Sequence, residues 1–384
     1  INLGWNDLNN GGLTVRMAVL NGQERTVFGW DGYSYQPFGS FVIGSHEYQR
    51  DGPIYLNRAI NNQNGASFTF NSPVVLLKDT GITTYGGNIT FNSTINSYEG
   101  TAYGLTAVTQ PYYCGMCFTT FNKPVGNLTP LGYLEVYGIS ILNSNITTDG
   151  NQYYRDYVGI GDMYSNKDRT VRMSSINGNI IFNSAIDDVG NYMNCLMGGC
   201  TVNSDSLFLR ADNGTVILGG DIGYFSALDR LKIYSANPLN LNVNVTTWNL
   251  QEYVAPAIAL GRDVTLNGSS GTISFITDSL VTRRSDAIYS PGGTLAIATY
   301  TPGTPINLGW NDLNNGGLTV RMAVLNGQER TVFGWDGYSY QPFGSFVIGS
   351  HEYQRDGPIY LNRAINNQNG ASFTFNSPVV LLKD

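Results

Sequence analysis

The chain has 384 residues, a formal net charge of −7 at pH 7 and 13% charged residues, whereas ordinary soluble proteins contain about 25%. It has no cluster of Lys and Arg to neutralise phosphates, which argues against nucleic acid as a partner. No stretch approaches the roughly 18 apolar residues of a membrane helix, so we expect no membrane span. Because 42% of the residues are hydrophobic and 12% are aromatic, the composition also argues against disorder.

Residues 1–79 recur without a single change as residues 306–384, at an offset of 305 residues. Diverged repeats within one domain do not stay identical over such a length, so the identity indicates a recent or deliberate duplication. The chain begins at Ile1 without a signal peptide and stops inside the repeated segment, so we expect it to be one and a quarter periods of a longer array. Identical sequence in like surroundings should adopt one conformation in both copies.

Apolar side chains stand at every second position in many short segments. Such alternation is typical of β-strands with one buried face, and the Gly, Asn, Asp and Ser pairs between the segments are typical of tight turns. The nearest candidate for a helix is 251–260, which Pro256 interrupts. The predicted strands, in chain order, include 171–173, 180–182, 207–209, 216–218, 231–233, 239–245, 258–260, 264–266, 273–275 and 295–297.

A weaker repeat lies inside the 305-residue period. The pattern Gly-x-Ile-x-Phe occurs at 87–91, 178–182 and 271–275, at spacings of 91 and 93 residues. Its Ile and Phe residues should be buried and should occupy equivalent places in successive modules. The modules predicted from this rhythm are 1–82, which is incomplete at its N-terminal side, 83–186, 187–283, and 284–384 as the start of the next period.

Two all-β folds are compatible with short strands at this spacing. A β-solenoid stacks one coil on the next, and a string of β-sandwich modules also has short strands at close spacing. We favour the solenoid, because Asn-rich strands with few charges suit stacking of like side chains about 4.8 Å apart. Sandwich modules would need linkers, and only Tyr300–Pro305 resembles one.

Three segments together resemble a known family. They are Ile146–Val158, Leu207–Gly223 and Leu228–Ile233, and Val245–Tyr253 is a partial second copy of the first. Their phrases are similar to the repeats of giant bacterial surface proteins of the filamentous haemagglutinin type, and the resemblance covers most of the period. It implies a right-handed β-helix, secretion, and an adhesive or fibre-forming role.

The function expected from these observations is a non-catalytic structural repeat of an extracellular or cell-surface fibre or adhesin stalk. Its expected partners are copies of itself along or beside a fibre, with surface glycans as a second class, and we expect no cofactor. The alternative is a carbohydrate-binding or carbohydrate-active β-helix. His46 and its copy His351 are the only histidines, and no nucleophile with a positioned base can be assembled around them.

The four cysteines fall in two close pairs, Cys114 with Cys117 and Cys195 with Cys200. A secreted fibre lies in an oxidising space, so we expect structural disulfides, each within its own pair. Pairing between the two pairs, free thiols and a zinc site remain the alternatives.

Overall fold

In the computed structural model, the described residues are 1–3, 13–23, 31, 33–34, 36–44, 52–110, 116–162, 168–189, 205–309, 313, 315–328, 332–349 and 357–382. The chain forms two compact units, residues 1–203 and residues 204–384. Both units consist mainly of short β-strands, and every pairing between named strands is parallel in the part of the chain described. The all-β prediction is therefore confirmed.

Most strands of the first unit belong to three sheets. The first contains β1 (Asn2–Leu3), β2 (Thr14–Val15), β4 (Ile54–Leu56), β7 (Val74–Leu76) and β10 (Ile95–Ser97). The second contains β5 (Ile60–Asn62), β8 (Thr80–Thr84), β11 (Leu105–Thr109), β13 (Leu134–Tyr137), β16 (Gln152–Tyr154) and β19 (Ile180–Phe182). The third contains β3 (Ser40–Ile43), β6 (Ser67–Phe70), β9 (Ile89–Phe91), β12 (Phe118–Phe121), β14 (Ile139–Leu142), β17 (Val158–Ile160) and β20 (Ile186–Asp188). Two further strands, β15 (Ile146–Thr148) and β18 (Thr170–Ser175), pair with each other, and α1 (Met17–Leu20) is a single helical turn.

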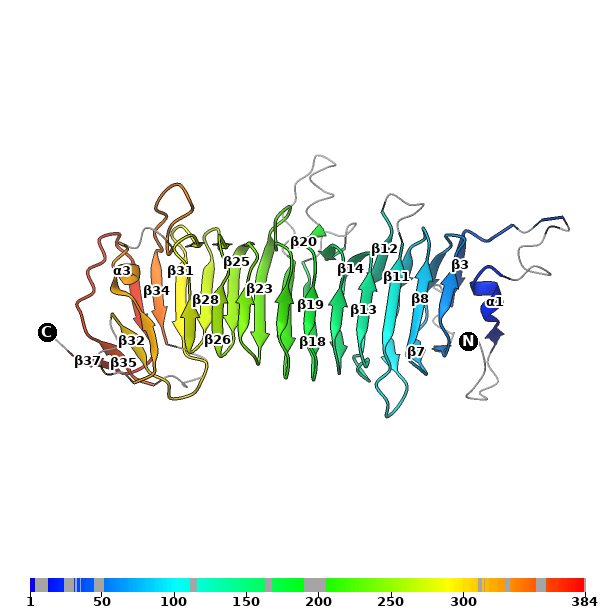
Figure 1. The fold of residues 1–384 in the computed structure, drawn as a ribbon, viewed down its shortest axis with the longest axis horizontal. Helices are drawn as coiled ribbons and strands as arrows, with labels where there is room; N and C mark the ends of the chain where they lie inside the picture. The colour runs from blue at the N-terminus through cyan, green and yellow to red at the C-terminus, as the bar shows by residue number, and fades with distance from the viewer. Residues whose placement is uncertain are drawn as a thin grey trace. The chain divides into compact units, whose positions relative to one another are not determined.

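Consecutive strands of this unit enter the three sheets in turn, and the chain then returns to the first sheet. β7, β8 and β9 pair in this way with β10, β11 and β12, the next three strands of the chain (Figure 1). We call each such set of three a three-strand cycle. A strand inside the series is hydrogen-bonded to its equivalents in the cycles before and after it, so each cycle depends on its neighbours for both its edges.

The second unit is built from the same kind of parallel ladder. Its longest sheet runs through β21 (Ser206–Ala211), β23 (Leu228–Ser235), β25 (Val245–Val254), β28 (Thr272–Ile276), β31 (Thr294–Ala298), β34 (Ser345–Ile348) and β36 (Ser372–Phe375). Shorter ladders join β24 (Leu239–Leu241), β26 (Ala257–Leu260) and β29 (Ser279–Val281), and join β27 (Thr265–Asn267) to β30 (Ala287–Tyr289). The last ladder contains β33 (Leu318–Val320), β32 (Ile306–Leu308), β35 (Ile359–Leu361) and β37 (Val379–Leu381), while β22 (Val216–Leu218) and the turn α3 (Met322–Leu325) complete the unit.

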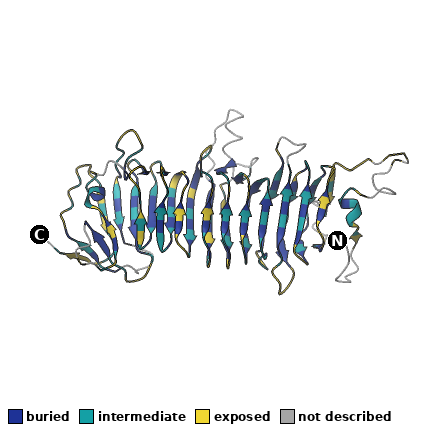
Figure 2. Ribbon diagram, in the orientation of Figure 1, coloured by how far each residue is buried: buried dark blue, intermediate teal, exposed yellow. Residues whose placement is uncertain are grey.

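Buried and less buried residues alternate along most strands, as Figure 2 shows. The Ile and Phe residues of the three Gly-x-Ile-x-Phe segments are at most 1% exposed, which confirms their predicted burial. The first two segments, however, lie in β9 and β19, which belong to different sheets. They are therefore not equivalent in space, and the module boundaries at 82, 186 and 283 stay a prediction.

Aromatic side chains in register form columns inside the first unit. Phe70 stacks on Phe91 and Phe91 on Phe121, with ring centroids 5.0 and 5.4 Å apart and planes within 12° of parallel. Burial of each ring stabilises the fold by about 1.5–3 kcal/mol, and a stacked pair adds about 0.5–1.5 kcal/mol. The columns thus tie each cycle to the next through side chains as well as through backbone hydrogen bonds.

The two copies of the duplicated segment have the same local structure, as expected from their identity. Helical turns α1 and α3 are flanked by residues with nearly the same backbone angles. The pairing of β1 with β4, β3 with β6 and β4 with β7 recurs as β32 with β35, β34 with β36 and β35 with β37. One element differs, because β5 has no counterpart strand in the second copy.

Candidate functional site

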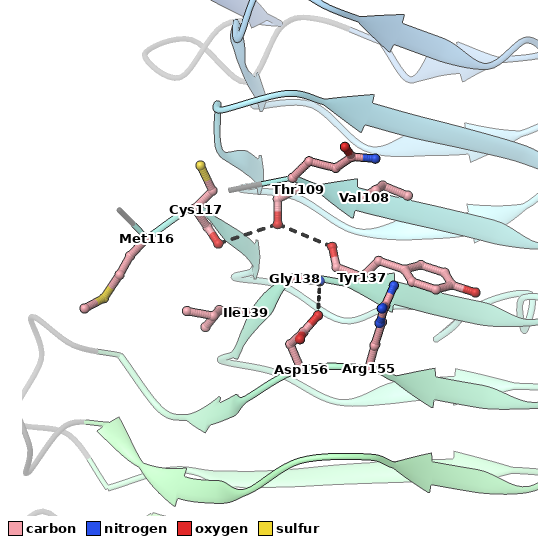
Figure 3. A pocket seen from close by; sticks show the side chains of 10 residues that line it. Val108, Thr109, Met116, Cys117, Tyr137, Gly138, Ile139, Arg155 and Asp156 are labelled. Atoms are coloured by element: carbon pink, nitrogen blue, oxygen red, sulfur yellow. Dashed lines mark hydrogen bonds between the residues drawn. The ribbon is translucent and has the colours of Figure 1, made fainter. Parts of the chain in front are cut away.

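A pocket of about 680 Å³ lies on the first unit where the chain turns from the second sheet into the third (Figure 3). The pocket is positioned by the ends of β11 and β13 and by the corner that follows β16. Its lining residues are Val108, Thr109, Gln110, Met116, Cys117, Tyr137, Gly138, Ile139, Arg155 and Asp156.

Polar contacts between neighbouring corners hold the backbone around this pocket. The Thr109 hydroxyl lies 3.5 Å from the Cys117 carbonyl oxygen and 3.4 Å from that of Tyr137. The Gly138 amide donates a hydrogen bond of 2.8 Å to the Asp156 carboxylate. Gly138 has a φ of 105°, and a Cβ added there would lie 2.0 Å from the Thr109 hydroxyl oxygen. The corner therefore requires glycine.

Aromatic and cationic groups line one wall of the pocket. The Tyr137 ring lies 5.7 Å from the Tyr153 ring, and the Arg155 guanidinium carbon lies 5.8 Å from the centre of Tyr137. Partial burial, helped by the nearby Glu135 carboxylate, raises the pKa of the Tyr137 phenol. This phenol is therefore neutral at physiological pH, where it can donate a hydrogen bond but does not act as a base.

The acidic groups that line this pocket limit the acid–base chemistry that its described residues could carry out. Glycoside hydrolysis in most families uses two carboxylates on either side of the scissile bond. Asp156 is the one carboxylate among the described lining residues, and it is engaged by the Gly138 amide. The described part of the chain holds no group of three His, Cys, Asp or Glu side chains placed to bind a metal ion.

The structure places only one of the predicted disulfide residues. Cys117 is 4% exposed and lies just before β12. Cys114, Cys195 and Cys200 lie outside the described residues, so the disulfide pairing stays a prediction. His46 and His351 lie outside them as well.

Sequence reasoning missed a ladder of asparagine side chains beside the Phe column. The amides of Asn92, Asn122 and Asn143 each donate to the side-chain oxygen of the preceding Asn, at 2.8, 2.7 and 2.6 Å. The first acceptor is Asn71, whose own amide donates to the Gly44 carbonyl at 3.4 Å. The signal was present in the sequence, because Phe or Leu followed by Asn and Ser or Lys recurs at all four positions. The ladder stabilises the stacking of one cycle on the next.

Comparison with protein-family models, with curated proteins and with solved structures finds no match for this chain. None of the described helices is long and apolar enough to cross a membrane.

Proposed function

We propose that the chain is a non-catalytic structural repeat of an extracellular or cell-surface fibre or adhesin stalk, built as a right-handed β-solenoid. The observation that carries the proposal is the packing of the duplicated segment. In the first copy its strands β5, β6 and β7 pair with β8, β9 and β10 of the cycle that follows. In the second copy its strand β34 pairs with β31 of the cycle that precedes. One segment that accepts a neighbour on either edge has the property that a repeating array requires.

The distribution of charge supports the same function. Residues in register on stacked strands lie about 4.8 Å apart, so like charges would repel one another. On adjacent strands of the long sheet, Lys232 of β23 and Glu252 of β25 have opposite charges and form an ion pair at 3.1 Å. A chain with few charges avoids repulsion however many cycles are added, which suits a long fibre.

The test is to lengthen the protein by whole periods. Chains with one or two further copies of residues 80–384 should form rods that grow by a constant increment for each period. At about 25 residues per cycle and about 4.8 Å per strand, the increment is roughly 60 Å. Electron microscopy of single particles measures it. Separate beads joined by flexible segments would contradict the solenoid and favour the string of β-sandwich modules.

A second candidate function is glycan binding at the pocket beside Tyr137 and Arg155. Aromatic faces beside a hydrogen-bond donor are suited to sugar rings. Binding of oligosaccharides to the 384-residue chain and to its Tyr137→Ala variant, measured by calorimetry, tests it. Equal binding by the two proteins would assign the affinity to another surface.

A further inference from the structure

A cleft of about 450 Å³ lies in the second unit, at a place where two parallel ladders end. β29 is the last strand of the ladder that it forms with β26 and β24, and β33 is the first strand of the ladder that continues through β32. The two strands adjoin each other, but in the described part of the chain no ladder joins them. The cleft thus marks an interruption of the backbone hydrogen bonding that connects neighbouring cycles.

The interruption falls at the junction between two periods of the sequence. β29 belongs to the end of the 305-residue period, whereas β33 belongs to residues 306–384, which repeat residues 1–79. Each side of the cleft carries arginine. Arg283 and Arg284 follow β29, and Arg321 follows β33 directly. A ligand held between these side chains would therefore contact both periods.

The cleft is a local excess of positive charge. All three arginines that line it are exposed, and the other described lining residues, Thr282 among them, are uncharged. Within the described residues no carboxylate forms an ion pair with Arg283 or Arg284. This is unusual in a chain with 21 Lys and Arg residues against 28 Asp and Glu residues. Like charges that share one cleft repel one another, and a bound anion would remove that repulsion.

A buried carboxylate holds the corner that carries two of the arginines. Asp286 is fully buried and accepts hydrogen bonds from the Val264 amide, at 3.3 Å, and from the Arg283 amide. Its own amide donates to the Arg283 carbonyl at 3.1 Å, which closes a tight turn over residues 283–286. This turn fixes the position from which Arg283 and Arg284 extend, and Asp286 is not among the residues that line the cleft.

From this arrangement we infer that the cleft is a binding site for a multivalent oxyanion, which joins the end of one period to the start of the next. Guanidinium groups bind the oxygen atoms of carboxylate and phosphate through charge-assisted hydrogen bonds, often two at a time. An anion with two or more negative charges can engage Arg283 or Arg284 on one side and Arg321 on the other. Inorganic phosphate and small polycarboxylates share this chemistry. The inference concerns the junction alone and does not depend on where the protein works.

Anion binding at this junction should be linked to stability. In the unfolded chain the three arginines do not share one site, so the anion binds the folded junction preferentially and stabilises it. Loss of one arginine removes like-charge repulsion when no anion is present, so it should leave the protein as stable as wild type or more stable. The opposite sign is expected for an arginine with a purely structural role, because its loss destabilises the protein with or without the anion.

The first experiment is calorimetric titration of the 384-residue protein with sodium phosphate at low ionic strength, because salt screens contacts of this kind. Arg284→Gln and Arg321→Gln should each weaken phosphate binding by at least about tenfold, the loss expected for one hydrogen bond between charged groups. The matched control is Arg16→Gln. Arg16 is the copy of Arg321 in the first unit and does not line the cleft, so its loss should leave the affinity unchanged.

Titration with citrate and with acetate identifies the kind of anion. Citrate carries several planar carboxylates, whereas phosphate is a single tetrahedral group. Tighter binding of citrate would assign the site to polycarboxylates, and tighter binding of phosphate would assign it to phosphate; either result supports the cleft as an anion site. Acetate carries one charge and cannot engage both sides, so acetate binding as tight as that of phosphate and citrate would contradict the inference.

The second experiment locates the effect within the fold. Hydrogen exchange of residues 279–281 and 318–320, which form β29 and β33, should slow on addition of saturating phosphate. The slowing should occur in wild type and in Arg16→Gln but not in Arg284→Gln. Denaturant unfolding without phosphate should show that Arg284→Gln is at least as stable as wild type.

The inference is supported if Arg284→Gln and Arg321→Gln lose phosphate or citrate binding while Arg16→Gln keeps it. It would be overturned by the absence of binding of both anions at millimolar concentration, or by equal weakening in all three variants. Destabilisation of Arg284→Gln in the absence of any anion would also overturn it, since that result assigns the arginine a purely structural role.

Discussion

The two copies of the duplicated segment carry the same 79 residues but bury different ones. In the first copy Leu76 is fully buried and Leu13 is 69% exposed; in the second, the matching Leu381 is 71% exposed and Leu318 is 4% exposed. Hydrogen bonds within the described parts of the copies nevertheless recur, as in the Asn62 amide to the Leu20 carbonyl at 2.8 Å and the matching pair at 2.7 Å. Local sequence therefore sets the conformation, whereas the neighbouring cycle sets the burial.

The largest difference in stability between matched variants is expected at residues that a neighbouring cycle covers in one copy but not in the other. Leu318→Asp buries an unpaired carboxylate and should lower the free energy of unfolding by about 5 kcal/mol. Leu13→Asp makes the identical change on the uncovered edge and should stay within about 0.5 kcal/mol of wild type. Denaturant unfolding followed by hydrogen exchange measures both. Similar losses for the two variants would mean that burial of this leucine is set within the copy.

Phe70 and its copy Phe375 test the opposite case, because at this position a neighbouring cycle covers the first copy and not the second. Phe70→Ala removes a fully buried ring between two others and should cost about 3–5 kcal/mol, while Phe375→Ala at the half-buried copy should cost about 1–2 kcal/mol. The measurement is the same, with hydrogen exchange read in residues 67–76 and 372–381. A larger loss at Phe375 would contradict the assignment of the covered edge.

The asparagine ladder that begins at Asn71 of the first copy and continues through Asn92 should be more sensitive to loss of an amide than Asn376, the residue of the second copy that matches Asn71. Asn92→Ala removes the two hydrogen bonds that Asn92 makes with Asn71 and with Asn122, and it should cost about 2 kcal/mol. Asn376→Ala removes a single hydrogen bond of 3.0 Å to the Gly349 carbonyl and should cost about 1 kcal/mol or less. Thermal unfolding of the two variants beside wild type decides whether the ladder is cooperative.

High pH should act on cycles that lie outside both copies. Burial raises the pKa of Tyr154 and of Tyr253 well above the usual value of about 10. Stability from each neutral phenol is complete below pH 10 and is lost as pH rises from there toward the folded pKa. The expected loss is about 1.4 kcal/mol per pH unit for each tyrosine. Unfolding measured from pH 9 to pH 11 should show a smaller slope for Tyr253→Phe than for wild type.

The smallest difference is expected at Asp31 and Asp336, where both copies have the same local contacts. Backbone amides of Ser34 and Tyr33 lower the pKa of Asp31, and those of Ser339 and Tyr338 lower the pKa of Asp336. Stability from these carboxylates is present above pH 4 and decreases as pH falls below it. Carboxyl titration by NMR should give equal pKa values in the two copies. Unequal pKa values would show that the stacking of neighbouring cycles affects even these exposed turns.

Apolar alternation predicted the strands whose inward side chains are apolar, such as those at Phe182 and Phe275. It could not reveal strands that turn polar side chains inward, such as β8 and β16. Thr84 and Gln152 are fully buried there, and each donates to a carbonyl oxygen of an adjacent strand or corner, at 2.7 and 2.8 Å. A hydrophobic pattern does not register a polar residue that is satisfied by a neighbouring cycle.

The pocket was hidden from sequence for a different reason. Val108, Tyr137 and Arg155 meet there, but 29 and 18 residues separate them. They meet because the turns between strands, the corners, differ in length. A local sequence pattern does not give the length of a corner until the strands of each cycle have been assigned.

Those unequal corners also bear on how such a chain changes during evolution. One residue separates β13 from β14, four separate β8 from β9, and eight separate β11 from β12. The strands β9, β12 and β14 nevertheless remain in register with one another. A single insertion within a strand would turn every following side chain to the opposite face, whereas insertions at a corner leave the frame intact. Corners are therefore the positions where the chain can gain loops, and with them new ligands, while the strands keep their register.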